Sequence, residues 1–150
     1  MWTPWSRRSL GSAEDRATYE TLHTASLAAP ALRRGLDEDS ASASLKHLRT
    51  LLGAPSVALT DTERVLAVEG SRERRSDAME LARQAIAAGA TQAFSTPHAH
   101  YPHAIVAPLT VEDTVVGALV VRSPTSSAGL ARATTEVARW MSSQLELAEL

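Results

Sequence analysis

Two valine-dense runs near the carboxyl end constrain the fold of this 150-residue chain most strongly. Ala104 to Leu109 and Thr114 to Arg122 are almost continuously apolar, and only residues 110–113 separate them. Runs of this kind are typical of strands that are covered on both faces of a sheet. The sequence therefore predicts a hairpin at the centre of a buried sheet.

Three further strands are predicted. Val57 to Leu59 and Val65 to Val68 have strand-like patterns, and the turn-like residues 61–64 join them into a second hairpin. Thr91 to Phe94 has the length of a short edge strand. Because hairpins connect most of these strands, we expect a mostly antiparallel sheet of five to six strands.

Segments with helical periodicity surround the strands. One helix is predicted to begin after Ser12 and to be interrupted at Pro30, because proline lacks a backbone donor. A short helical piece, 31–34, follows it. Another predicted helix has Asp37 or Asp39 as its cap and ends at Gly53. The remaining predicted helices are 79–88, which Gly89 terminates, and 130–150. The charged residues 71–77 lack apolar anchors and are predicted to form a solvated loop. The fold class is α+β, with the helices packed on one face of the sheet.

The length corresponds to one domain. Residues 1–11 show no periodicity and are expected to be a flexible arm, so that the domain proper is 12–150. The segment 130–150 ends with its apolar period unfinished, and we expect this helix to continue into a longer protein.

Composition excludes several kinds of chemistry. The chain has no cysteine, and therefore no disulfide, thiolate zinc site or cysteine nucleophile. Its net charge of −2 provides no basic surface for nucleic acid. The Arg7–Arg8 pair precedes a polar stretch rather than the apolar region of an export signal, and no run is long enough to cross a membrane, so a cytoplasmic location is expected. No serine or carboxylate pair has the context of a hydrolase.

Three segments carry a resemblance to a known family. They are TLHTASLAAPALRRGL (21–36), GAPSVALTDTERVLAVEG (53–70) and HAIVAPLTVEDTVVGALVV (103–121). They resemble the amino-terminal GAF sensor domain of LytS-type sensor histidine kinases, in the soluble actinobacterial form, and the resemblance covers Tyr19 to Leu150. It departs from the family where relatives carry cysteine before the third segment, because this chain has PHAHYPH there.

The resemblance implies a GAF-like sheet and a sensory role. In such kinases the last helix leads to a dimerisation and phosphoacceptor segment and then to an ATP-binding domain. The present residues contain neither a phosphoacceptor motif nor a nucleotide-binding glycine box, so this segment is expected to be no enzyme. The implied partners are a second copy of the chain, the downstream kinase domain in the full-length protein and its response regulator. The sequence identifies no cofactor.

The resemblance also implies a small-molecule pocket between the sheet and its cover of helix and loop. Residues expected to line it are Val57, Leu59, Phe94, Tyr101, Ile105, Ala107, Ala118 and Val120. For the aliphatic members, plain core packing is the alternative explanation.

A proline-bracketed loop contains His98, His100 and His103. Imidazoles bind zinc, copper, nickel and iron, so one hypothesis is a metal site. The alternatives are solvated histidines and a loop that senses pH or an anion. No acidic ligand lies nearby in the sequence.

Two apolar stripes on the terminal helices form the candidate dimer interface. Its residues are Leu22, Ala25, Ala29, Leu130, Val137, Met141, Leu145 and Ala148. Paired across a two-fold axis, the helices would form a bundle that transmits a signal. The alternative is packing against the sheet of the same chain. Three hypotheses therefore stand: a ligand sensor, a ligand-free dimerisation or interaction module, and a metal-binding module.

Overall fold

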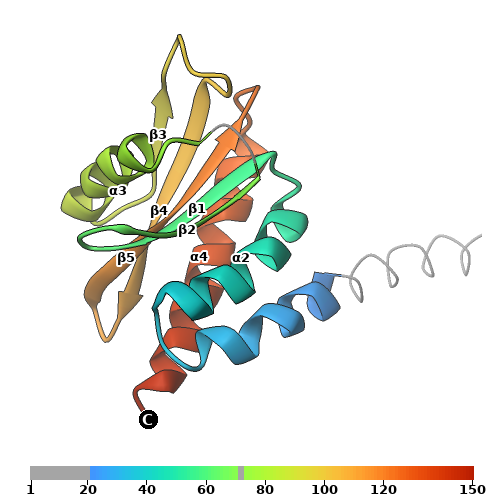
Figure 1. The fold of residues 1–150 in the computed structure, drawn as a ribbon, viewed down its shortest axis with the longest axis vertical. Coiled ribbons are helices and arrows are strands. Elements are labelled where there is room, and N and C mark those ends of the chain that lie inside the picture. The colour runs from blue at the N-terminus through green and yellow to red at the C-terminus, as the bar shows by residue number, and fades with distance from the viewer. Residues whose placement is uncertain (1–20, 71–72) are drawn as a thin grey trace, which may run out of the picture.

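The computed structural model describes residues 21–70 and 73–150 of the chain. The predicted arm, 1–11, and the predicted helix start after Ser12 lie outside the described residues. The described part forms a twisted sheet with helices against it (Figure 1).

Five antiparallel strands make up the sheet, in the order β2-β1-β5-β4-β3. They are β1 (Ser56–Asp61), β2 (Val65–Gly70), β3 (Gln92–Ser95), β4 (His103–Val111) and β5 (Thr114–Ser123). Both predicted hairpins, β1–β2 and β4–β5, are confirmed, and so is β3 as an edge strand. The β4–β5 turn consists of Glu112 and Asp113, both with positive φ, as a tight two-residue hairpin turn requires.

Three helices have both ends within the described residues: α2 (Glu38–Leu52), α3 (Arg75–Ala88) and α4 (Ala128–Ala148). The Asp37 side chain caps α2, and Gly53 and Gly89 end α2 and α3 in the left-handed conformation that glycine adopts without penalty. Residues 21–32 are helical as well. None of the helices in the described ranges has the combination of length and apolarity that crossing a bilayer demands.

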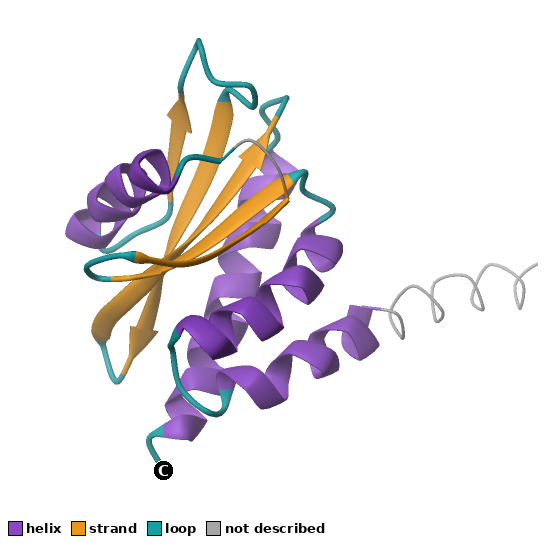
Figure 2. Cartoon of the chain, viewed as in Figure 1, coloured by secondary structure: helices purple, strands orange, loops and turns teal. Residues whose placement is uncertain are grey.

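The helices cover both faces of the sheet (Figure 2). Leu119 and Val121 of β5 belong to a core with residues of α2 and α4, whereas the alternate residues Ala118 and Val120 belong to a core with α3. The α+β class is confirmed, but the expectation of helices on one face is wrong for α3. The buried β4 and β5 need this second layer, because the side chains of a strand alternate between the two faces.

Pro30 does not interrupt the first helix, which continues to residue 32. Proline deprives the Ser26 carbonyl of its helical donor, but Ser26 and Pro30 are both exposed, so water can reach that carbonyl. The next two residues, Ala31 and Leu32, are buried in the core. Their packing holds the helix together past the proline.

Candidate functional site

Arg122 is the one arginine among the described residues that is buried, with 5% of its surface exposed. It lies near the end of β5 and points, like Ala118 and Val120 before it, to the α3 face of the sheet. Its cross-strand neighbours are Ser56 of β1 and Ala104 of β4. Because both neighbours are small, they leave room for the guanidinium to lie over the sheet.

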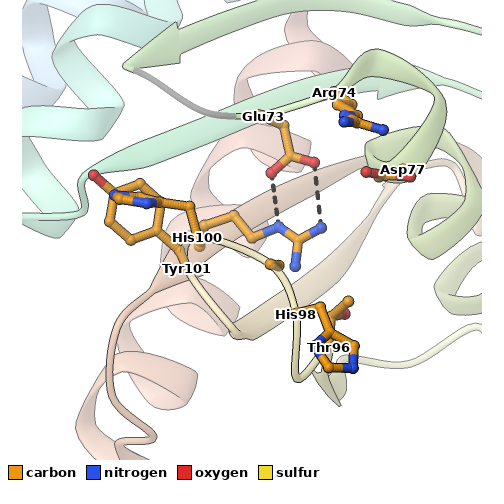
Figure 3. A pocket seen from close by; sticks show the side chains of 9 residues that line it. Glu73, Arg74, Asp77, Thr96, His98, His100 and Tyr101 are labelled. Carbon is orange, nitrogen blue, oxygen red and sulfur yellow. Dashed lines mark hydrogen bonds and ion pairs between the residues drawn. The ribbon is translucent and has the colours of Figure 1, made fainter.

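Glu73 neutralises this guanidinium from the segment that precedes α3. Its Oε2 accepts from Nε of Arg122 at 2.7 Å and its Oε1 from Nη2 at 3.3 Å, and the Glu73 side chain is only 2% exposed (Figure 3). The expectation of a solvated loop at 71–77 is therefore wrong for Glu73, and α3 already begins at Arg75. A buried ion pair of this kind requires good geometry, since both charges lose their hydration.

A cavity of about 500 Å³ opens beside the ion pair. The first turn of α3 and the β3–β4 loop form its walls (Figure 3). The lining residues are Glu73, Arg74, Asp77, Thr96, His98, Ala99, His100, Tyr101 and Arg122. Hydrogen bonds within the loop, from the Thr96 amide to the Pro102 carbonyl and from the Ala99 amide to the Thr96 carbonyl, hold its shape. The His100 and Tyr101 rings also contact each other edge to face, with their centroids 4.6 Å apart.

Two polar atoms in this region are buried without a hydrogen-bond partner among the described residues: Nη1 of Arg122 and Oγ of Ser56. Buried polar groups in folded proteins nearly always have a partner, and leaving one unpaired costs about 1–3 kcal/mol. Of the two residues only Arg122 lines the cavity, and its unpaired donor is one for which a ligand could supply the missing acceptor.

Opposite formal charges balance around the cavity. Arg74 and Arg122 contribute two positive charges, and Glu73 and Asp77 contribute two negative charges. Arg74 is also the N-cap residue of α3 and makes no capping hydrogen bond with its side chain. The amides of the first helical turn therefore add positive potential at this wall.

The eight predicted pocket residues do not converge on one cavity. Val57, Leu59 and Ala107 lie in the core under α2 and α4, whereas Ala118 and Val120 lie in the opposite core under α3. Their burial on two faces of the sheet fits the packing alternative.

Ala107 also borders a space of about 620 Å³ beside α4, and the remaining three lie at two other cavities. Phe94 and Ile105 line a smaller space of about 280 Å³, and Tyr101 lines the Arg122 cavity. Of the eight, Tyr101 alone lies at the ion pair.

The three histidines of the loop do not come together either. His98 and His100 line the Arg122 cavity, but His103 begins β4 and lines the smaller space beside Phe94. In the parts of the chain that the structure describes, no group of three histidine, aspartate or glutamate side chains is placed to hold a metal ion. The metal hypothesis is therefore not supported by the geometry.

Much of the candidate dimer interface packs within the chain. Met141, Leu145 and Ala29 are buried in the core, with 0%, 2% and 7% of their surface exposed. Leu130 and Val137 are partly buried against the same core, and Ala25 and Ala148 are half-buried. Leu22 alone is largely exposed, at 65%. Packing in the same chain thus accounts for the two buried members of the α4 stripe, Met141 and Leu145.

Sequence reasoning missed Glu73 and Arg122. One signal was available in the sequence. Arg122 falls on the same face of its predicted strand as Ala118 and Val120, and an arginine buried there needs an anionic partner. The identity of that partner was not readable, because Glu73 is 49 residues away in the sequence.

No family model matches the chain, and no curated protein matches its sequence. Solved structures do match its fold. The GAF domain of a protein described as a sensor histidine kinase, from Pseudomonas syringae pv. tomato, superposes with a TM-score of 0.62 at 16% identity, over 94% of this chain and 91% of that one.

Two other matches carry small molecules. The phycocyanobilin-bound GAF domain of a cyanobacterial phytochrome gives a TM-score of 0.61 at 16% identity, over 86% of this chain and 95% of that one. The free methionine-R-sulfoxide reductase of Neisseria meningitidis, in complex with its substrate, gives 0.57 at 15% identity, over 75% of this chain and 79% of that one. At such identities the matches establish the architecture, and this chain has a GAF-like fold.

Proposed function

We propose that this chain is the sensory domain of a signalling protein, and that it binds a small molecule in the Arg122 cavity. The observation that carries the proposal is the buried guanidinium with an unpaired Nη1 beside a cavity of about 500 Å³. This volume lies in the usual range for ligand sites. The fold supports the proposal, because the structures that share it include a GAF domain from a protein described as a sensor histidine kinase and a GAF domain with bound phycocyanobilin.

The covalent path from the cavity to α4 supports a relay. Arg122 is followed closely by Ser127, the residue that caps α4 with its hydroxyl. Between them the Ser123 hydroxyl donates to the Thr125 carbonyl and accepts from the Thr125 amide, which makes the connection short and tight. A ligand that shifts the end of β5 therefore acts directly on the start of α4. Two states of this junction would suffice for signalling.

The finer parts of the proposal depend on the sequence resemblance. They are a LytS-type histidine kinase as the output module, a response regulator as its partner, a homodimer as the signalling unit and a location in the cytoplasm. Catalysis is not proposed for these residues. A thiol-based reaction in particular is excluded, since the chain has no cysteine.

A cavity-filling variant tests ligand binding. Purified protein is screened by thermal shift against nucleotides, bilins, amino acids and short carboxylic acids, and Ala99→Phe is compared with the wild type. Ala99 lines the cavity, so the bulky ring should abolish the stabilisation by any compound that binds there. Ala87→Phe is the matched control, because Ala87 is exposed on α3 and lines none of the cavities described above.

We expect at least one compound to raise the Tm of the wild type and of Ala87→Phe while leaving that of Ala99→Phe unchanged. If each active compound stabilised all three proteins equally, the cavity would not be the binding site. If none stabilised the wild type, the sensory proposal would lose its support and the ligand-free interaction module would be favoured.

A further inference from the structure

The ion pair with Glu73 uses only part of the hydrogen-bonding capacity of Arg122. A guanidinium has five N–H donors, on Nε, Nη1 and Nη2. Glu73 approaches side-on and takes the Nε donor and one Nη2 donor. Both Nη1 donors and the second Nη2 donor remain; one Nη1 donor and this Nη2 donor form the adjacent, end-on edge of the group, and the other Nη1 donor points back toward Cδ.

The free edge is buried as well as unpaired. The Arg122 side chain is 6% exposed, and Nη1 has no partner within the described residues. Two parallel N–H donors of this kind match the two oxygens of a carboxylate, and such bidentate pairs are among the strongest hydrogen bonds in proteins. Glu73 meanwhile fixes the guanidinium, so that little orientational freedom is lost when the second acceptor binds.

The charges around the cavity select the class of acceptor. The formal charges of Arg74, Arg122, Glu73 and Asp77 cancel, so the cavity offers no excess positive charge to a dianion such as phosphate. The unpaired donors and the start of α3 still favour one negative charge at the Arg122 edge. The cavity of about 500 Å³ is much larger than one carboxyl group, and therefore leaves room for the body of a ligand.

We infer that the ligand carries a carboxylate, which binds the Nη1–Nη2 edge of Arg122, adjacent to the Nε–Nη2 edge that Glu73 holds. The inference depends on the proposed function of the cavity and names the chemistry that the cavity recognises. Glu73 acts as a positioning residue, since it orients the arginine without contacting the ligand.

Matched acids and amides test the inference. The probes are acetate, butyrate and benzoate, each compared with its amide, together with inorganic phosphate. The measurement follows the ¹⁵N-resolved Nε–H resonance of Arg122 at probe concentrations up to about 10 mM, which detects binding in the millimolar range. We expect at least one acid to shift this resonance and to bind about tenfold or more tightly than its amide, because charged acceptors form the stronger bond.

Two variants separate recognition from structure. Arg122→Lys keeps the charge but loses the planar edge, and should weaken binding of the acid about tenfold or more. Glu73→Gln keeps an acceptor for Nε but removes the competing negative charge, and should tighten binding severalfold. Should the lysine variant fail to fold, the comparison of acids with amides on the wild type still decides, because both its arginine and Glu73 are intact. Glu112→Gln, in the turn at the far end of β5, loses the same charge and should bind like the wild type.

The outcomes distinguish the inference from the proposed function. Equal binding of acid and amide overturns the carboxylate inference while the cavity remains a ligand site. Stronger binding of phosphate than of every acid overturns it too. If no probe shifts the Arg122 resonance, the carboxylate inference fails, and the Ala99→Phe screen decides separately whether the cavity binds anything.

Discussion

At the residue scale, Gly117 shows how closely β1 and β5 approach. A Cβ atom added at Gly117 would lie 2.0 Å from the carbonyl oxygen of Thr60 and 3.1 Å from a methyl group of Leu36. The first of these atoms belongs to the backbone of the neighbouring strand, which cannot move without breaking the pairing of β1 with β5. The absence of a side chain at this position is therefore a requirement of the sheet.

Gly117→Ala should lower the free energy of unfolding by about 3 kcal/mol, as overpacking against a rigid neighbour does. Gly129→Ala is the control, because a Cβ there meets nothing nearer than 3.5 Å and the position lies in the first turn of α4. Alanine at that site should leave stability unchanged or raise it by up to about 1 kcal/mol. Urea denaturation of both variants measures the difference, and similar stabilities would contradict the proposed clash.

The Asp37 carboxylate provides a pH-dependent cap for α2. It accepts from the Ser40 amide at 2.7 Å, and this hydrogen bond holds the pKa of the Asp37 carboxyl below its ordinary value. A carboxyl whose pKa is lowered by folding contributes stability that is fully present above its unfolded pKa of about 3.9. That contribution is lost as the pH falls through the lower, folded pKa.

Asp37→Asn should therefore keep most of the stability that the cap contributes at neutral pH, since asparagine also caps helices. It should not show the loss of stability that protonation of Asp37 causes in the wild type at low pH. Asp37→Ala should lower the Tm at neutral pH. Thermal melts of the three proteins between about pH 2 and pH 7 measure both effects. Parallel Tm curves for the wild type and Asp37→Asn across the acid range would show that the carboxylate contributes nothing specific.

At the element scale, α4 packs on the sheet of its own chain. Met141 is completely buried there, whereas Leu147 on the same helix is 44% exposed. Met141→Ala should cost about 2–5 kcal/mol, because it leaves a cavity in a close-packed core, and Leu147→Ala should change stability by no more than about 0.5 kcal/mol. Denaturation at two protein concentrations is the measurement. If the cost at Met141 vanished on dilution, its packing would depend on a second chain, contrary to the structure.

Elements with a local signature could be predicted from the sequence. Asp37, one of the two predicted caps, begins α2, and Gly53 and Gly89 end α2 and α3 where expected, because caps depend on neighbouring residues alone. The hairpins followed from strand-like runs joined by short turns. Pro30 was misjudged because the packing of the residues that follow it outweighs its local penalty.

The candidate site was less predictable, since it depends on contacts between distant segments. Glu73 lies in a charged stretch that looks solvated, and its burial follows only from the position of Arg122 on β5. The aliphatic pocket candidates all belong to strands of the sheet, but neighbouring strand residues face opposite sides of it. Placing them correctly required knowing which helix covers which face.

At the scale of the whole molecule, the cavity and the helix stripes have separable roles. The cavity lies on the α3 face, and α2 and α4 cover the other, so a ligand at Arg122 has no direct contact with the α4 stripe. The β5–α4 connection is the covalent link between them. Ligand binding and self-association are therefore expected to be testable independently of each other.

The exposed leucines of the helical segment 21–32 are where we expect a second copy to bind. Leu22 and Leu27 are 65% and 47% exposed, while Ala28 and Leu32 of the same segment are buried in the core. The hydrogen bond from Arg33 to Gln144 ties the carboxyl end of this segment to α4. A helix that packs on the core of its own chain and still exposes leucines can pair with the same helix of a second copy. We therefore expect a dimer of twice the 16.0 kDa chain mass in light scattering.

The double variant Leu22→Glu/Leu27→Glu should convert this dimer into a monomer, because it places like charges at the contact, and should leave the fold intact. Gln84→Glu, on an exposed position of α3, is the control and should remain dimeric. Circular dichroism verifies that both variants are folded. A wild type that is monomeric at every concentration would remove the paired helices from the signalling scheme, and any ligand response would then have to travel through α4 of a single chain.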